Sequence, residues 1–346
     1  MSSKSTGFLS DLRNGFSRCG VVNQRLLIGV SGGADSVALL RGTLQLAGEL
    51  SLVVCVAHLN HRLRRTASDD DAVWVKSLAD AHGCQVEIGE LPSDTLSLGQ
   101  AGLEEHARTL RHRFYETTAS TLNCSVVALG HSADDQAETV LHHLVRGTGL
   151  AGLRGIPSVR QTASGLRLVR PMLSVRRQQI EDYLQELAQD YRTDATNQDT
   201  SLTRNRLRHV ILPLLREQLN PQVDQALCRL AEQAREVDEV IQQAASDLLA
   251  KCLTDRLADL CRINIAPLQG QPNHLVREVF REIWRRQGWP RQAMGYEQWN
   301  RLLDVLATRE TITLPDRIDV RFHTDNLLVI RRIAADARIN PASIQP

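Results

Sequence analysis

The 346-residue chain has few lysines, few aromatic residues and no closely spaced cysteines. Its seven cysteines include no C-x-x-C pair, which argues against a zinc ribbon and against a dithiol redox motif. No apolar run approaches the ~18 residues that span a bilayer. The first twenty residues lack the ~7–15-residue apolar core of a signal peptide. We therefore expect a cytoplasmic protein with no membrane association.

The scarcity of lysine makes the cation content unusual. Lysine occurs only at Lys4, Lys76 and Lys251, so 38 of the 41 basic residues are arginine. Arginine suits bidentate phosphate recognition, although genome base composition produces the same bias. The net charge of +1 gives no strong overall field that would indicate a nucleic-acid partner. The length allows two domains of about 150 residues each.

The first half of the chain alternates short apolar segments with longer segments of helical spacing. Expected strands are 25–30, 52–58, 85–91 and 125–130, and expected helices are 36–50, 67–82 and 103–121. Nearly continuous apolar strands that alternate with helices indicate an α/β fold with a doubly wound, mostly parallel sheet. Ligands bind beyond the carboxyl ends of such strands, and three polar motifs begin there.

The second half reads as a mainly helical domain that ends in a small β hairpin. Helical spacing covers 221–250, 274–287 and 296–307, and two β-like segments at 311–314 and 320–332 follow. We place the boundary near Arg216, before Asn220 and Pro221, which predicts domains 1–216 and 217–346. Three tryptophans in the second domain could stack on a base, although core packing is the simpler use for each; these are Trp284, Trp289 and Trp299.

A candidate phosphate-binding loop follows the first expected strand. It reads Ser31, Gly32, Gly33, Ala34, Asp35 and Ser36. The glycines let the backbone approach a phosphate, and the N–H groups that open the next helix face an anion. Asp35 would repel a bare phosphate, so its expected role is to hold Mg²⁺ against it. A strand–helix turn with an N-capping Asp or Ser is the structural alternative.

A second polar motif follows the fourth expected strand. It begins with His131 and Ser132 and carries Asp135 and Glu138 three residues apart, on one helix face. One carboxylate could bind metal while the other, or His131, takes a proton. Ser132 as an N-cap followed by acidic residues in the first helical turn explains the same pattern structurally.

Further polar segments accompany these two motifs. They lie at 58–64, 104–111, 146–156, 170–173, 194–199 and 204–208. The first string, S-G-G-A-D-S, resembles the signature of PP-loop ATP pyrophosphatases, which cleave ATP between the α and β phosphates. In this order and spacing, the whole set resembles the tRNA(Ile)-lysidine synthase family. The resemblance is dense from about residue 26 to 213 and faint afterwards. Longer members carry a further C-terminal domain, which this chain is too short to hold whole.

The resemblance implies ligation of free L-lysine to the wobble cytidine of the isoleucine tRNA with a CAU anticodon. The implied cofactors are ATP and Mg²⁺, with His58 beside the nucleotide and Asp35 on the metal. Arg108, Arg111 and His131 are the other expected catalytic residues besides Asp35, Asp135 and Glu138. The residues expected to contact lysine or tRNA are Asp135, Glu138, Arg146, Gly147, Arg204, Asn205 and Arg208. The oligomeric state stays open, with a homodimer as one alternative.

Three other functions remain open at this point. A tRNA thiolase is the nearest alternative, although sulfur carriers in that group commonly use paired cysteines. A small-molecule amidotransferase of the GMP or NAD synthetase kind is the second. A non-catalytic RNA-binding module is the third, and the presence of Asp35, Asp135 and Glu138 argues against it.

Overall fold

The computed structural model describes residues 3–60, 66–91, 100–193 and 203–333. Their contacts divide the chain into two compact units, Met1–Ala234 and Arg235–Pro346. The division falls inside the long helix α10 (Val223–Cys252), whereas the sequence places the domain boundary near Arg216. Each unit is described by itself, and the assignment of catalysis to 1–216 and of tRNA binding to 217–346 stays a prediction.

The first unit is built on a six-stranded sheet with the order β3-β2-β1-β4-β6-β5. All neighbours pair in parallel except β5 and β6 at one edge. The strands are β1 (Gln24–Gly29), β2 (Leu52–Asn60), β3 (Gln85–Glu90), β4 (Val126–Leu129), β5 (Val159–Gln161) and β6 (Arg167–Val169). The expected mostly parallel α/β sheet is therefore confirmed.

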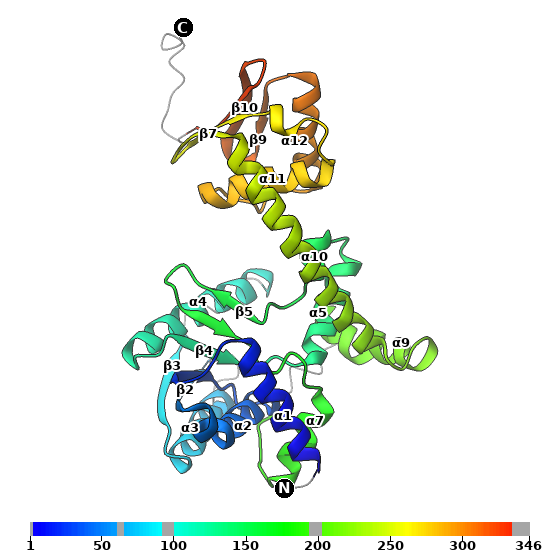
Figure 1. The fold of residues 1–346 in the computed structure, drawn as a ribbon. Helices are drawn as coiled ribbons and strands as arrows, with labels where there is room; N and C mark the ends of the chain where they lie inside the picture. Colours follow the sequence, from blue (N-terminus) through cyan, green and yellow to red (C-terminus); the bar gives the residue numbers. More distant parts are fainter. Residues whose placement is uncertain (1–2, 61–65, 92–99, 194–202, 334–346) are drawn as a thin grey trace. The chain divides into compact units, whose positions relative to one another are not determined.

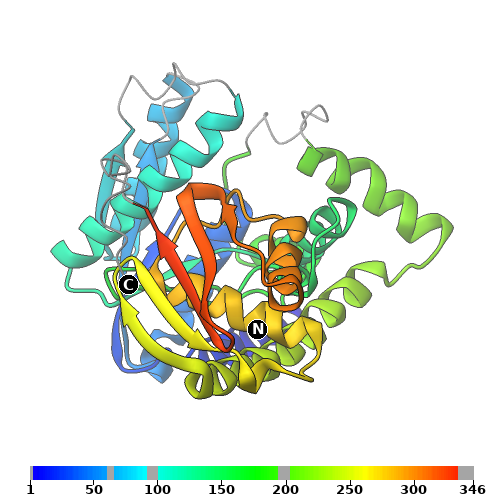
Figure 2. The ribbon, with the colours of Figure 1, turned by 90° about the horizontal axis from the view of Figure 1, so that it is seen from above.

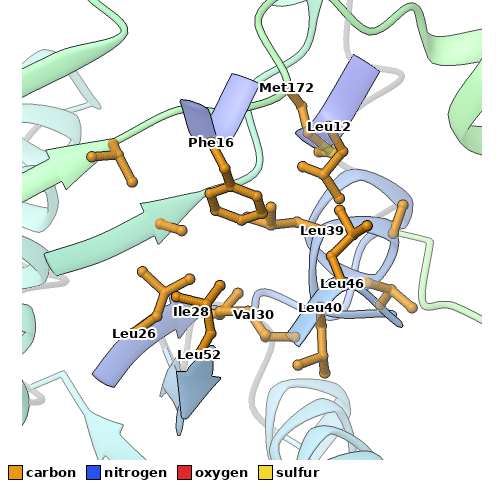
Figure 3. Packing of buried hydrophobic residues seen from close by; sticks show 14 of the residues in the cluster. Leu12, Phe16, Leu26, Ile28, Val30, Leu39, Leu40, Leu46, Leu52 and Met172 are labelled. Carbon is orange, nitrogen blue, oxygen red and sulfur yellow. The ribbon is translucent and has the colours of Figure 1, made fainter. Parts of the chain in front are cut away.

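Helices cover both faces of this sheet because successive strand residues point to opposite sides. Leu26 and Ile28 face a core under α1 (Ser3–Arg18), α2 (Ala34–Leu50), α3 (Thr66–Ala81) and α7 (Arg177–Glu186). Leu27 and Val127 face a separate core under α4 (Gln100–Thr121). Figures 1 and 3 show the helices and the first of these cores, in which Phe16 and Leu39 pack above the strands.

A helical cluster follows the sheet and carries the remaining motifs. It comprises α5 (Ala133–Val145), α6 (Leu150–Leu153), α8 (Thr203–Arg206), the π-helical turn η3 (Leu207–Ile211) and α9 (Leu212–Gln218). Leu141, Leu207 and Leu212 share a buried cluster, so η3 and α9 are held against α5. The polar segment 204–208 of the sequence is helical, since it lies in α8 and η3.

The second unit contains more sheet than the sequence predicts. After α10 come β7 (Leu253–Leu257), β8 (Leu260–Asn264), α11 (Asn273–Gln287), α12 (Tyr296–Thr308), β9 (Ile312–Leu314), β10 (Ile318–Thr324) and β11 (Leu327–Arg332). The strands form an antiparallel sheet in the order β7-β8-β11-β10-β9, seen side by side in Figure 2. The expected helices are confirmed, and the closing hairpin is part of this five-stranded sheet.

The tryptophans of the second unit pack its core. Trp284, Trp289 and Trp299 are each at most 4% exposed. Trp284 contacts the other two edge-on, with ring centroids 5.1 and 5.3 Å apart. Core packing, the simpler of the two uses, is confirmed, and none of the three offers an open stacking face. Among the described residues, no helix is long and apolar enough to cross a membrane.

Candidate active site

The loop after β1 is held in a tight turn by its own serines. Gly32 adopts φ +95°, a conformation that favours glycine. The Ser36 hydroxyl donates to the Gly33 carbonyl at 2.9 Å and accepts from the Ser31 N–H at 3.1 Å. These hydrogen bonds within the loop hold its backbone in this conformation.

Helix α2 begins at Ala34, two residues earlier than the sequence suggested. Its N-cap, Gly33, has extended backbone angles and makes no side-chain cap. The first N–H groups of a helix lack intrahelical partners, so this end can receive an anion beside the helix dipole.

Asp35 lies in the first turn of α2, with its side chain 21% exposed. Its Oδ2 accepts from Arg177 Nη2 at 3.3 Å, whereas its Oδ1 is buried with no hydrogen-bond partner. Burial raises the Asp35 pKa to about 6, against the opposing charge of Arg177. An unpartnered carboxylate oxygen beside a phosphate-binding loop fits Mg²⁺, which takes few protein ligands and shares its shell with phosphates. No group of three metal-binding side chains occurs among the described residues.

Two residues at the ends of β4 and β2, Gly130 and His58, explain how the loop meets the neighbouring strands. Gly130 follows β4, and a Cβ placed there would lie 2.9 Å from the Asp35 carbonyl, so the close approach requires glycine. His58, at the end of β2, is 4% exposed, and its Nδ1 lies 2.8 Å from the Val30 carbonyl oxygen. Burial lowers the His58 pKa, so the neutral ring donates this bond and supports the loop from behind.

The acidic pair lies at the start of α5. Ser132 is the N-cap, and its N–H donates to Asp135 Oδ2 at 2.9 Å while the Asp135 N–H donates to its hydroxyl. Burial opposes ionisation of Asp135, but the Ser132 N–H and the charge of Arg204 outweigh it and lower the pKa. Both the capping and the functional interpretations of this motif are therefore compatible with one geometry.

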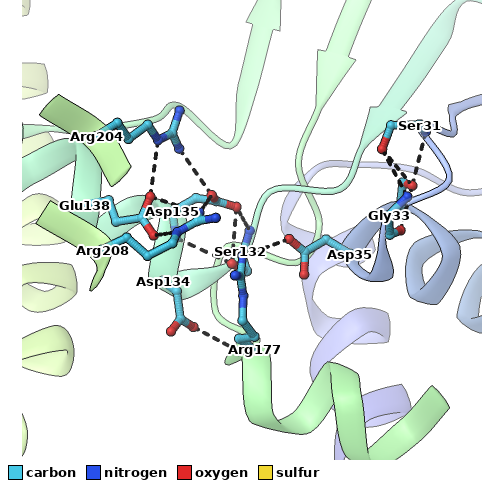
Figure 4. Close-up of polar contacts among 11 residues, drawn as sticks. Ser31, Gly33, Asp35, Ser132, Asp134, Asp135, Glu138, Arg177, Arg204 and Arg208 are labelled. Atoms are coloured by element: carbon cyan, nitrogen blue, oxygen red, sulfur yellow. Dashed lines mark hydrogen bonds and ion pairs between the residues drawn. The ribbon is translucent and has the colours of Figure 1, made fainter. Parts of the chain in front are cut away.

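Two arginines close over the acidic pair, as Figure 4 shows. Arg204 donates to Glu138 Oε2 at 3.2 Å and to Asp135 Oδ1 at 3.1 Å. Arg208 donates to both Glu138 oxygens and to Asp135 Oδ1 at 3.1 Å. The Arg204 side chain is 52% exposed and that of Arg208 20%, against 2% for Glu138. Two guanidinium groups thus neutralise two buried carboxylates.

His131 lies near both Asp135 and Arg204, whose charges act on its ring. Its Nδ1 is buried and has no hydrogen-bond partner. Burial lowers the His131 pKa to about 4, against the attraction of Asp135, and the charges of Arg170, Arg204 and Arg111 lower it further. The ring is therefore neutral at pH 7.

One cavity of about 700 Å³ brings most of the expected residues together. Its lining contains Ser31, Gly33, Ala34, Asp35, Ser36, Arg111, His131, Asp135, Arg204, Asn205 and Arg208. Gly32, His58 and Glu138 are not part of the lining but adjoin or bond residues that form it, while Arg108, Arg146 and Gly147 lie outside it. Residues 61–64 and 194–199, which carry parts of the expected motifs, lie outside the described residues.

The cavity also contains residues that the sequence did not indicate. Arg177 joins the two motifs, since its side chain bonds Asp35 and its N–H donates to Asp134 Oδ2 at 2.8 Å. Arg192 donates its N–H to the Gly32 carbonyl at 2.9 Å and its Nε to Asp71 at 2.8 Å. Tyr115 from α4 and Glu181 from α7 complete this part of the lining. No motif marks these residues, because each contacts a partner far away in sequence.

Comparison with known proteins agrees with this geometry. The PP-loop domain family matches residues 6–215. The tRNA(Ile)-lysidine synthase of Rhodopirellula baltica is 32% identical over 314 residues, which cover 81% of this chain and 79% of that protein. The enzyme of the same name from Nostoc sp. is 33% identical, with 75% and 78% covered. A third, from Solibacter usitatus, is 43% identical over 61% of this chain, which spans less than half (45%) of that relative.

A solved structure extends the likeness to the fold. The U34-tRNA thiolase NcsA of Methanococcus maripaludis matches with a TM-score of 0.55 at 16% identity, over 67% of this chain and 79% of that one. At this identity the match supports the fold alone. On the family match and the curated relatives, the chain belongs to the tRNA(Ile)-lysidine synthase family of PP-loop proteins.

Proposed function

We propose that this protein joins free L-lysine to the wobble cytidine of CAU-anticodon isoleucine tRNA and converts ATP to AMP and pyrophosphate. The observation that carries the proposal is the shared cavity, in which the loop around Asp35 and the acidic site at Asp135 face one space. An adenylating loop and a cation-binding carboxylate site are the two parts that such a ligation needs.

The first step is assigned to the loop. The phosphates of ATP lie against the N–H groups that open α2, and the cytosine carbonyl oxygen attacks the α-phosphorus. The bond from that phosphorus to the bridging oxygen breaks, and pyrophosphate leaves. Mg²⁺ held by Asp35 would neutralise charge on the phosphates. Arg111 and Arg177 line the same cavity and supply fixed positive charge where negative charge develops.

The second step is assigned to the acidic pair. The lysine ε-nitrogen bonds to the activated ring carbon, the bond from that carbon to the activating oxygen breaks, and AMP leaves with the oxygen. Asp135 lines the cavity and is ionised, so it can hold the lysine ammonium group. Arg204 is the more exposed of the two arginines, and we propose that the substrate displaces it from the carboxylates while its charge stays beside the bound lysine.

Lysine must lose a proton before it attacks. The positive charges of Arg204 and Arg208 next to the ammonium group favour its neutral form, because like charges lower the pKa of an amine. His131 is neutral and its buried Nδ1 is unpartnered, so it can accept the proton that the amine releases as the new bond forms.

The proposal is tested by incubating the protein with Mg-ATP, labelled lysine and a CAU-anticodon isoleucine tRNA transcript. Labelled lysine should become covalently attached to this RNA. A methionine tRNA transcript shares the anticodon and serves as the control, which should stay unlabelled. No label on the isoleucine tRNA under conditions where the protein binds it would refute the proposal.

A further inference from the structure

Arg170 is a buried arginine outside the cavity lining. It directly follows β6 and is 7% exposed. Its Nη1 donates to the Pro157 carbonyl oxygen at 2.9 Å, whereas its Nε is buried without any hydrogen-bond partner. A buried guanidinium group normally bonds a carboxylate or another anion, so the unused donor is unexpected.

Two further arginines lie on the same side of the sheet. Leu168 of β6 belongs to the core under α4, so by strand alternation Arg170 also faces α4. Arg160 of β5 pairs directly with Leu168 and therefore faces the same way, with its side chain exposed. The carboxyl end of β6 is thus flanked by Arg160 on its antiparallel neighbour.

Helix α4 brings Arg108 to this end of the strand. Ser164, in the turn that precedes β6, donates to Glu116 of α4 at 2.7 Å. Arg108 is eight residues before Glu116, about 12 Å along the helix, toward the end of β6 where Arg170 lies. Burial, together with the nearby charges of Arg160 and Arg108, lowers the Arg170 pKa to about 10.

Two of these arginines, Arg160 and Arg170, form no ion pair with a carboxylate among the side chains that the structure describes. The charges of Arg160 and Arg108 act on Arg170 instead. Two further positive charges near a buried guanidinium group destabilise the fold. A bound anion would remove this repulsion and satisfy the free Nε donor.

Hydrogen bonds hold the backbone around Arg170 in place. Gln136 of α5 accepts from the Ile156 N–H at 2.7 Å and donates to the Arg154 carbonyl at 3.3 Å. The Arg170 N–H donates to the Ser158 carbonyl at 2.9 Å. The segment around Arg170 is therefore tied to the helix that carries Asp135 and Glu138, which gives the arginines a defined position relative to the reacting groups.

We propose that Arg170, Arg160 and Arg108 form a second phosphate-binding site, which holds an RNA backbone phosphate close to the reacting nucleotide. The strand order β1-β4-β6 puts this site two strands, about 10 Å, from the nucleotide loop. It lies on the far side of His131, outside the cavity assigned to ATP. The inference rests on the proposed function, since it takes tRNA as the substrate.

The test measures binding of the isoleucine tRNA transcript at several salt concentrations, without ATP or lysine. Arg160→Gln and Arg160→Glu should weaken binding several-fold and reduce the slope of log affinity against log salt by about one phosphate contact. Arg170→Lys keeps the charge but loses the planar fork, and it should weaken binding with an unchanged melting temperature. Affinity for ATP and for pyrophosphate should stay at the wild-type value in each variant.

The matched control is Arg113→Gln, which removes an exposed arginine from α4, the helix that carries Arg108. The charge of Arg113 acts on Glu116. This variant should bind RNA like the wild type. Wild-type RNA affinity and slope in the Arg160 variants would overturn the inference. Weaker pyrophosphate binding with unchanged RNA binding would overturn the RNA assignment. A wild-type protein that binds no tRNA would instead refute the proposed function itself.

Discussion

Arg208 clamps the Glu138 carboxylate with two bonds, from Nε at 2.5 Å and from Nη2 at 3.0 Å. Glu138 is 2% exposed, so this contact and the longer one from Arg204 take the place of water around its carboxylate. We therefore expect the Arg208–Glu138 pair to stabilise the first unit in addition to its proposed role in catalysis.

Replacing Arg208 should destabilise the first unit. Arg208→Met leaves Glu138 buried with only Arg204 as a partner, and breaking a buried pair costs about 3 kcal/mol or more. Arg13→Gln is the control, because Arg13 pairs with Glu49 where both side chains are more than 40% exposed, and such pairs contribute about 1 kcal/mol or less. Urea unfolding of the two variants measures the difference. Equal losses would contradict the account, whereas Glu138→Gln combined with Arg208→Met should recover part of the stability.

Replacing Arg204 should strengthen lysine binding but slow turnover. In Arg204→Gln the acidic pair loses its exposed partner, so we expect a lysine KM at least about fivefold lower, equivalent to about 1 kcal/mol. The kcat should fall and its pH profile should shift upward, because one positive charge no longer lowers the pKa of the amine. Arg206→Gln, an exposed neighbour in the same helix, is the control. A higher KM with an unshifted profile would argue against displacement of Arg204 by lysine.

Asp35 should lower the stability of the folded protein at neutral pH although pyrophosphate release depends on it. Its folded pKa of about 6 exceeds the ordinary 3.8, so the folded protein holds this proton more tightly than the unfolded chain. Stability from this group is therefore present near pH 4 and lost as the pH rises through 6. Asp35→Asn should stabilise the ligand-free protein at pH 7.5 by about 2 kcal/mol and abolish pyrophosphate release while RNA binding persists. Unfolding at pH 4.5 is the control, where the gain should fall to about a third, because that pH lies only slightly above the unfolded pKa; an equal gain at both pH values would contradict the assignment.

The contribution of His131 to folding stability should depend on pH in the opposite direction to that of Asp35. Its pKa falls to about 4 from the ordinary 6.5, so the unfolded chain binds the proton more tightly between these values. Its contribution is present above pH 6.5 and lost as the pH falls toward 4. His131→Gln should therefore lose less stability than the wild type between pH 6.5 and 4.5, measured by urea unfolding. Identical pH slopes in the two proteins would refute a buried neutral ring.

The close contact between Gly130 and the nucleotide loop should leave no room for a larger residue at position 130. A Cβ at Gly130 would push on the Asp35 backbone, and such overpacking costs about 1–3 kcal/mol. Gly130→Ala should also weaken ATP binding, measured by calorimetry. Gly48→Ala is the control. Gly48 lies on α2, the helix that carries Asp35, and there is open space around its Cβ position. Normal ATP affinity in Gly130→Ala would show that the loop tolerates displacement.

Much of the first unit follows from local sequence. Apolar strands and amphipathic helices specify its parallel sheet, and the glycines and serines at 31–36 specify a tight turn at a strand end. The acidic residues after Ser132 were also identifiable, because capping and function favour the same positions. Local pattern therefore placed the two motifs that face the cavity.

Contacts between distant segments could not be predicted in this way. Arg177 reaches Asp35 across 142 residues, and Arg204 reaches Glu138 across 66, so neither pairing leaves a local signal. Strand β7 was missed because Leu253–Leu257 continues directly from α10 and is largely polar. For the tryptophans the sequence favoured core packing over base stacking, and their burial in the second unit decided between the two.

The most direct test of the central claim is pyrophosphate release from ATP, measured with and without the CAU-anticodon isoleucine tRNA and with and without lysine. The account predicts net release of one pyrophosphate per lysine attached, and only when both RNA and lysine are present. Sustained release that needs RNA but ignores lysine, or release that needs no RNA, would contradict it.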